Sequence, residues 1–198
     1  MRSLMRVTLA ALLLFVGVSF FYPRLERIHV TGGVHYSEAQ LLRLARLRVG
    51  YPLLWVTAQR VAPLKRDPWI LDVRVVRRWP NTLYLDVTER TPVLVTGRTA
   101  YALDGTVLPD ATPADRARAV PLTGWGPDRS AEAVDIFRLV APGQPRMLSY
   151  APSGFTVSFA TSSLYTPDAA LLRAHWSAFS EQQEKRVAVY PWGVSVQQ

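Results

Sequence analysis

The sequence predicts an α+β protein in which an N-terminal transmembrane helix precedes two small extracytoplasmic domains. Three observations support this prediction. An uncharged run over 7–22 follows two arginines, the stretch 25–90 has the order strand, helix, helix, strand, strand, and short strands separated by turn residues dominate after residue 91. Two helices and a three-stranded sheet form a layered unit in which one face of the sheet is covered.

The N-terminal segment has the features of a single-pass anchor. Sixteen residues at a helical rise of about 1.5 Å span roughly 24 Å, and a start at Leu4 brings the length close to a hydrocarbon core of about 30 Å. Arg2 and Arg6 precede this run, so the positive-inside rule predicts a cytoplasmic tail over 1–6, an anchor over 7–22 and an extracytoplasmic remainder. A cleaved signal peptide is the alternative, although Gly17-Val18-Ser19 leads directly into three aromatic residues.

The first domain is expected over 23–91. A β-branched run over 25–31 predicts a strand, and Ser37 with Gln40 forms a capping box at the start of a helix. Thr57 can cap a second helix through 64, which Pro63 would break or kink. Apolar residues alternate over 71–77 and 83–87 on either side of turn residues 78–81, which predicts a hairpin.

The second domain is expected over 92–198 and is richer in strands. Asp104-Gly105 is a strong hairpin turn between two short strands. The stretch 109–130 contains four prolines and two glycines, which predicts mostly irregular structure. A helix is expected over 131–140, a strand pair over 146–150 and 155–159, and two final strands over 186–190 and 194–196.

The chain offers no recognisable chemistry. With 198 residues, no cysteine and three histidines, it has no thiolate nucleophile and no ligand spacing typical of a metal site. Neither a nucleophile elbow nor a phosphate-binding glycine loop is present. Asp104 is explained by its turn, and Asp110 lies in irregular chain. We therefore predict no catalytic, cofactor-binding or metal site.

The net charge of +8 comes from the N-terminal half, which holds 15 of the 23 Lys and Arg residues. Arg74, Arg77 and Arg78 lie on the predicted hairpin beside Trp79 and could bind phosphates or stack on bases. A nucleic-acid role requires a cytoplasmic location, which the anchor argues against. A solvated basic face, or a contact with anionic lipid or acidic partners near the membrane, explains these residues better.

Several short motifs occur in a characteristic order behind the anchor. They are Ile28-x-Val30-x-Gly32, Asp67-Pro68-Trp69-Ile70, Arg78-Trp79-Pro80-Asn81 and Glu89-Arg90-Thr91-Pro92. This pattern resembles the FtsQ/DivIB family of bacterial cell-division proteins, and the resemblance covers most of the chain. It implies that 23–91 form a POTRA domain and that 92–198 form the family's β domain.

The resemblance also implies a function. Family members are non-enzymatic scaffolds in the plasma membrane at the division septum, where they recruit the bitopic proteins FtsB and FtsL upstream of septal peptidoglycan synthesis. In the family the last strand of the β domain pairs with FtsB. Carried over to this sequence, that implies partner binding by the following residues: Val187, Val189, Tyr190, Trp192, Val194 and Val196.

Two questions stay open at this stage. Pro191 lacks an N–H and interrupts the terminal segment, so the pairing edge could lie before or after it. A second function is also compatible with a POTRA domain, namely a chaperone or transport module of the cell envelope, although a single such unit is visible and no β-barrel segment follows.

Overall fold

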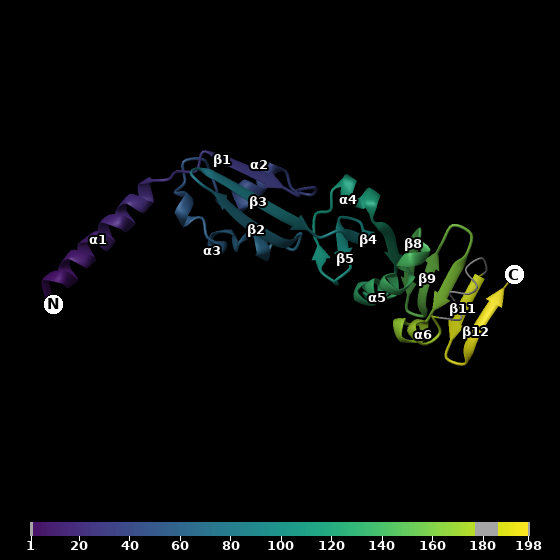
Figure 1. The fold of residues 1–198 in the computed structure, drawn as a ribbon. Coiled ribbons are helices and arrows are strands. Elements are labelled where there is room, and N and C mark those ends of the chain that lie inside the picture. The colour runs from purple at the N-terminus through teal and green to yellow at the C-terminus, as the bar shows by residue number, and fades with distance from the viewer. Residues whose placement is uncertain (1, 177–185, 198) are drawn as a thin grey trace. The chain divides into compact units, whose positions relative to one another are not determined.

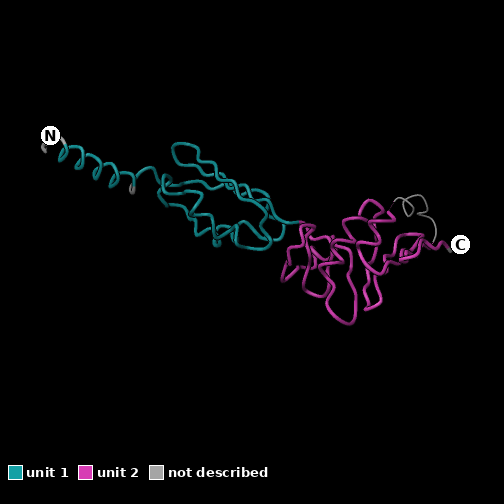
Figure 2. The backbone as a smooth tube through the Cα atoms, turned by 90° about the horizontal axis from the view of Figure 1, so that it is seen from below, with its two compact units in different colours: residues 1–90 teal, residues 91–198 magenta. Residues whose placement is uncertain are grey.

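A computed structural model describes residues 2–176 and 186–197, and it divides the chain into two compact units. The first unit comprises residues 1–90 and the second comprises residues 91–198 (Figure 2). Each unit has its own hydrophobic core.

The chain begins with α1 (Arg2–Phe21), a 20-residue helix. Apolar side chains such as Leu9, Leu12 and Phe15 are more than half exposed along it. Within the described ranges, no helix combines the length and the hydropathy that a membrane crossing requires. The anchor over 7–22 therefore stays a prediction.

The first unit is a three-stranded sheet with helices on one face (Figure 1). Its strands are β1 (Arg27–Thr31), β2 (Ile70–Arg78) and β3 (Thr82–Glu89), and its helices are α2 (Glu38–Leu44) and α3 (Ala58–Val61) with short 3-10 turns η1 (Leu53–Trp55) and η2 (Leu64–Arg66). The sheet order is β1-β3-β2, with β1 parallel and β2 antiparallel to β3. The predicted order of elements is confirmed, but the second helix ends at Val61, before Pro63.

The first unit is held together at one end by the carboxylate of Glu89. One oxygen of this side chain accepts hydrogen bonds from the backbone N–H groups of Val34 and His35, at 2.8 and 2.6 Å, and the other accepts from Tyr36 N–H at 3.1 Å. Hydrogen bonds to a charged acceptor are stronger than neutral ones. Glu89 therefore fixes the loop that leads into α2 against the end of β3.

Arg90, the next residue, fixes a second loop. Its guanidinium donates to the carbonyl oxygens of Pro68 and Ile70, at 3.0 and 2.8 Å. This loop also contains Trp69, which is 1% exposed. The backbone N–H of Trp69 donates to the Asp67 carboxylate at 2.9 Å. Arg90 thus connects two of the quoted motifs, 67–70 and 89–92, within the fold.

We expect Glu89→Gln to destabilise the first unit by about 1–2 kcal/mol, because a neutral amide has one acceptor oxygen for three donors that now share a carboxylate. Urea unfolding followed by tryptophan fluorescence measures the change. The matched control is Asp86→Asn on the same strand, whose side chain accepts one exposed hydrogen bond from Thr31. Equal stability of the two variants would contradict the clamp.

The second unit is a nine-stranded mixed sheet with helices. Its elements are β4 (Pro92–Thr96), β5 (Thr99–Ala102), β6 (Val107–Leu108), α4 (Pro113–Arg118), β7 (Val120–Gly124), α5 (Ser130–Val140), η3 (Ala141–Gly143), β8 (Met147–Ala151), β9 (Gly154–Ser158), β10 (Ser163–Thr166), α6 (Ala169–Ala174), β11 (Arg186–Tyr190) and β12 (Gly193–Gln197). The strand order is β12-β11-β10-β9-β8-β7-β4-β5-β6.

The core of the second unit lies between this sheet and helices α5 and α6. Fully buried side chains from the sheet, including Leu148, Phe155 and Val157, meet Ile136 and Leu172 from the two helices. The two helices are joined by polar contacts as well, since Glu132 accepts from Ala169 N–H at the start of α6. The C-terminal strands β11 and β12 thus belong to a sheet that packs against α5 and α6.

Two parts of the second unit differ from the sequence-based expectation. Residues 109–130 are not mostly irregular, because α4 and β7 lie there. Thr112 caps α4, and Asp115 completes the capping box with Pro113 at the first turn. The strand β10 was also not expected, although Leu164 and Thr166 alternate with half-buried residues along it. The elements α4, β7 and β10 have only four to six residues each. Tertiary contacts, more than local sequence preference, decide whether such short elements form.

Candidate functional site

The last two strands form a hairpin at one edge of the nine-stranded sheet. The strand β11 pairs with β10 in parallel and with β12 in antiparallel orientation, so it lies inside the sheet. The strand β12 pairs with β11 alone and is the edge strand of the described sheet. An edge strand presents unpaired N–H and C=O groups to an additional strand. Among the described strands, this edge of the sheet therefore lies after Pro191.

Pro191 does not interrupt the strand pairing. Tyr190 and Gly193 face each other across the hairpin, so Pro191 and Trp192 form a two-residue turn. The N–H that proline lacks is not needed for the ladder at this position. Gly193 has φ of 146°, in the region that favours glycine. The tight turn brings β12 into full register with β11.

The predicted partner-binding residues fall into two groups. Val187 and Val189 on β11 are 2% and 0% exposed and belong to the core of the second unit. Their cross-strand neighbours on β12 are Val196 and Val194, respectively. Val194 packs against the core, whereas Val196 is 37% exposed. The four valines thus line one face of the hairpin, and its exposure increases toward the chain end.

The other face of the hairpin carries aromatic side chains. Trp192 is 83% exposed and its ring stacks on Tyr190, with centroids 5.1 Å apart and an angle of 3° between the planes. Tyr190 also contacts Tyr165 of β10, at 6.0 Å between centroids. Sequence reasoning missed Tyr165 because β10 was not expected. Exposed tryptophans are frequent among the residues that contribute most to protein interfaces.

The geometry of the hairpin indicates which main-chain groups face outward. In an antiparallel pair, residues that exchange hydrogen bonds alternate with residues that do not. A two-residue turn is closed by a hydrogen-bonded pair, here Tyr190 and Gly193. Counting from this pair, the main-chain groups of Val194 and Val196 point away from β11. These are the groups that a further strand would engage.

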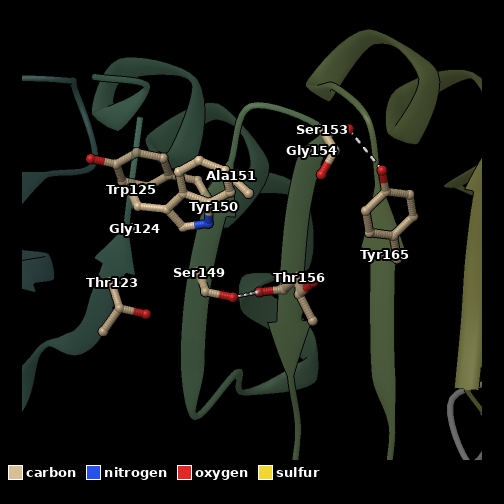
Figure 3. A pocket seen from close by; sticks show the side chains of 10 residues that line it. All are labelled: Thr123, Gly124, Trp125, Ser149, Tyr150, Ala151, Ser153, Gly154, Thr156 and Tyr165. Atoms are coloured by element: carbon tan, nitrogen blue, oxygen red, sulfur yellow. Dashed lines mark hydrogen bonds between the residues drawn. The ribbon is translucent and has the colours of Figure 1, made fainter. Parts of the chain in front are cut away.

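A pocket of about 320 Å³ lies on the neighbouring strands of the same unit (Figure 3). Its lining residues come from β7 to β10 and the turns beside them, and they include Trp125, Tyr150, Tyr165, Ser149 and Thr156. The Tyr165 hydroxyl donates to the carbonyl oxygen of Ser153 at 2.7 Å. Among the described residues, no carboxylate, imidazole, amine or guanidinium lines the pocket. Its hydroxyl and aromatic groups can bind and stack, but they include no carboxylate–histidine pair for acid–base chemistry.

Two of the three histidines are engaged in ring contacts. His35 stacks on Trp69 with centroids 3.7 Å apart, and His29 stacks on Tyr84 at 4.9 Å. In the described ranges, no group of three or more His, Asp or Glu side chains could hold a metal ion. Asp72 has a lowered pKa because Lys65 donates a hydrogen bond to its carboxylate, and both side chains are exposed.

Comparisons with known proteins agree with this architecture. Residues 24–90 match the family model described as "POTRA domain, FtsQ-type". The chain is 38% identical over 121 residues to the cell division protein FtsQ of Streptomyces coelicolor, an alignment that covers 59% of this chain and 46% of that protein. It is 33% identical over 113 residues to the cell division protein FtsQ of Geobacter sp. strain M21, covering 55% and 41%, respectively. The chain thus spans less than half the length of these curated relatives.

We expect Val187→Ala to lower the free energy of unfolding by about 1.5–3 kcal/mol, because it removes two buried methyl groups and leaves a cavity. Val196→Ala, directly across the hairpin, should cost less than about 1 kcal/mol because its side chain is partly in water. Urea unfolding of both variants measures the difference. Equal losses would show that Val196 is part of the core and not of the open edge.

Proposed function

The chain belongs to the FtsQ/DivIB family of bacterial cell-division proteins, and on that premise we propose that it is a non-enzymatic scaffold of the division machinery. The scaffold recruits FtsB- and FtsL-like bitopic proteins and connects them to septal peptidoglycan synthesis. The binding event is the addition of a partner strand to β12. Main-chain hydrogen bonds supply affinity in this mode, and side-chain contacts supply specificity.

The observation that supports this proposal is that β12 is long and uncharged in comparison with the other edge strands. Proteins protect sheet edges by making the strands short or by placing charges on them. At the other edge of the same sheet, β6 has two residues. In the first unit, β2 carries Asp72 and three arginines, and β1 carries Arg27. Within the described ranges, β12 is the edge strand that combines five residues with no charge.

We further propose that α1 anchors the protein in the plasma membrane at the septum, with 1–6 in the cytoplasm and residues 23–198 outside. Apolar side chains point to all sides of this helix: Val7, Leu12, Leu13 and Phe15 are each more than half exposed. A helix that is apolar all round is favoured within a protein core or a bilayer. Arg2 and Arg6 orient it with its N-terminus inside.

The scaffold role is tested by co-purification of the full chain from membranes, with bound proteins identified by mass spectrometry. Recovery of FtsB- and FtsL-like proteins is expected. Recovery of outer-membrane or secretion components in their place would favour the transport function and overturn the scaffold.

Val194→Pro should abolish retention of the FtsB-like protein, because it removes an N–H that faces the open edge. The fold should survive, since proline is tolerated where an edge N–H faces solvent. The measurement is pull-down together with circular dichroism. Val194→Thr, which keeps the N–H and nearly the same shape, is the matched control and should retain binding. A folded Val194→Pro variant that still binds would refute pairing at β12.

Trp192→Ala should weaken partner binding at least tenfold, which corresponds to about 1.4 kcal/mol, the scale of an interface hot spot. Its effect on stability should be small because the ring is largely in water. Surface plasmon resonance with the immobilised full chain measures the affinity. Trp125→Ala removes a ring that is 69% exposed in the same unit and serves as the control. Identical effects of the two substitutions would argue against a specific role for Trp192.

A further inference from the structure

A second site lies on the first unit, where arginines gather around one pocket. The pocket has a volume of about 360 Å³, and Arg43, Arg46, Arg48 and Arg60 line it together with the ring of Tyr51. In the part of the chain that the structure describes, no acidic residue lines this pocket. The Arg60 guanidinium lies over the Tyr51 ring, with its central carbon 4.7 Å from the ring centroid. Four like charges around one cavity favour an anion within it.

No carboxylate of the described residues neutralises these four arginines. Within the described ranges, none of the four forms an ion pair with a carboxylate. The Nε atom of Arg60 is buried and has no hydrogen-bond partner in that part of the chain. A buried charged donor without an acceptor is costly, and such atoms in folded proteins call for a specific explanation. Because the Arg60 side chain also lines the pocket, an anion bound there would lie beside this charge.

Backbone geometry supplies an independent argument. The helix α2 ends in a Schellman motif, in which Arg46 N–H donates to Arg43 O and Leu47 N–H donates to Leu42 O, both at 3.0 Å. The residue in the left-handed position of this motif is usually glycine, but here it is Arg46, with φ of 52°. A side chain at this position is strained, and strain of this kind is concentrated at functional sites. The guanidinium of this strained residue lines the pocket.

Backbone hydrogen bonds connect the pocket to the chain segment that follows the proposed anchor. Leu25 exchanges hydrogen bonds with the loop behind Arg48: its N–H donates to Tyr51 O at 2.8 Å, and its carbonyl accepts from Gly50 N–H at 2.7 Å. Val49 on this loop is 62% exposed. Leu25 follows the predicted end of the anchor at 22 by only three residues. If α1 spans the bilayer, the loop 48–51, which is hydrogen-bonded to Leu25, therefore lies close to the lipid headgroups. This step rests on the anchor in the proposed function.

We propose that this pocket binds a phosphate group, and that its source is the headgroup of an anionic phospholipid at the membrane surface. Arginine suits the role because its planar fork can donate two hydrogen bonds to one phosphate. Anionic lipid attracts basic groups that lie within a Debye length of the surface. A soluble phosphate compound shares the same chemistry, and the experiment below distinguishes the two sources.

The test uses the full chain in a non-ionic detergent, titrated by calorimetry with three probes: short-chain phosphatidylglycerol, the matching phosphatidylcholine, and inorganic phosphate. We expect saturable binding of phosphatidylglycerol, at least tenfold tighter than that of phosphatidylcholine. Tighter binding of inorganic phosphate than of phosphatidylglycerol would overturn the lipid source. Absence of saturable binding of all three would overturn the site.

Variants separate the pocket from general charge. Arg46→Gly and Arg60→Gln should each weaken binding tenfold or more, whereas Arg74→Gln, which removes the same charge from β2 of the same unit, should change it less than twofold. Arg46→Gly should also raise the melting temperature, because glycine relieves the positive φ. Loss of binding with gain of stability is a result that a merely structural arginine would not give. Equal weakening by Arg74→Gln would overturn the proposal.

This experiment contains neither a partner protein nor a bilayer. Its failure therefore leaves the scaffold proposal standing, and failure of the partner assays leaves the phosphate site standing.

Discussion

The main constraint on this protein is that a β-sheet cannot satisfy the main-chain groups of its own edge strands. In the second unit, each inner strand obtains partners on two sides, and the two ends of the sheet must be dealt with separately. One end is reduced to the two residues of β6, which offer little ladder to a further strand. The other end is a five-residue strand without a charge. This asymmetry gives the sheet one end suited to strand addition.

Strand addition is also favoured when the edge strand is preorganised before the partner binds. The residues behind β12 provide this rigidity: Val187 and Val189 are buried, and the parallel pairing of β11 with β10 connects the hairpin to the rest of the sheet. Arg129 strengthens this connection further along the sheet, because it donates to Ala151 O of β8 and to Pro167 O before α6. An edge that is preorganised in this way loses less conformational entropy when a partner orders against it.

Much of the first unit could be predicted from the sequence because its signals are local. The capping box at Ser37, the alternation along β3 and the turn before it need only neighbouring residues to be recognised. The role of Glu89 could not be derived in this way, because its three backbone donors are more than 50 residues away. In the second unit, β10 and α4 are short, and the parallel pairing of β10 with β11 joins segments separated by a helix. Which side of Pro191 forms the sheet edge could not be predicted either, because it depends on the pairing of β11 with β10.

The charge distribution follows the same division between the two units. Arginines at an edge or around a pocket repel further copies of the chain and attract anions, whereas an uncharged hairpin edge attracts a strand. The first unit holds Arg46 in a left-handed conformation that glycine would adopt more easily, and the buried Nε of Arg60 has no hydrogen-bond partner among the described residues. Both features cost stability, which the contact of Arg60 with the Tyr51 ring offsets only in part. They are explained if the first unit faces a polyanionic surface while the second unit faces a polypeptide, so that each unit carries the surface chemistry that its own partner requires.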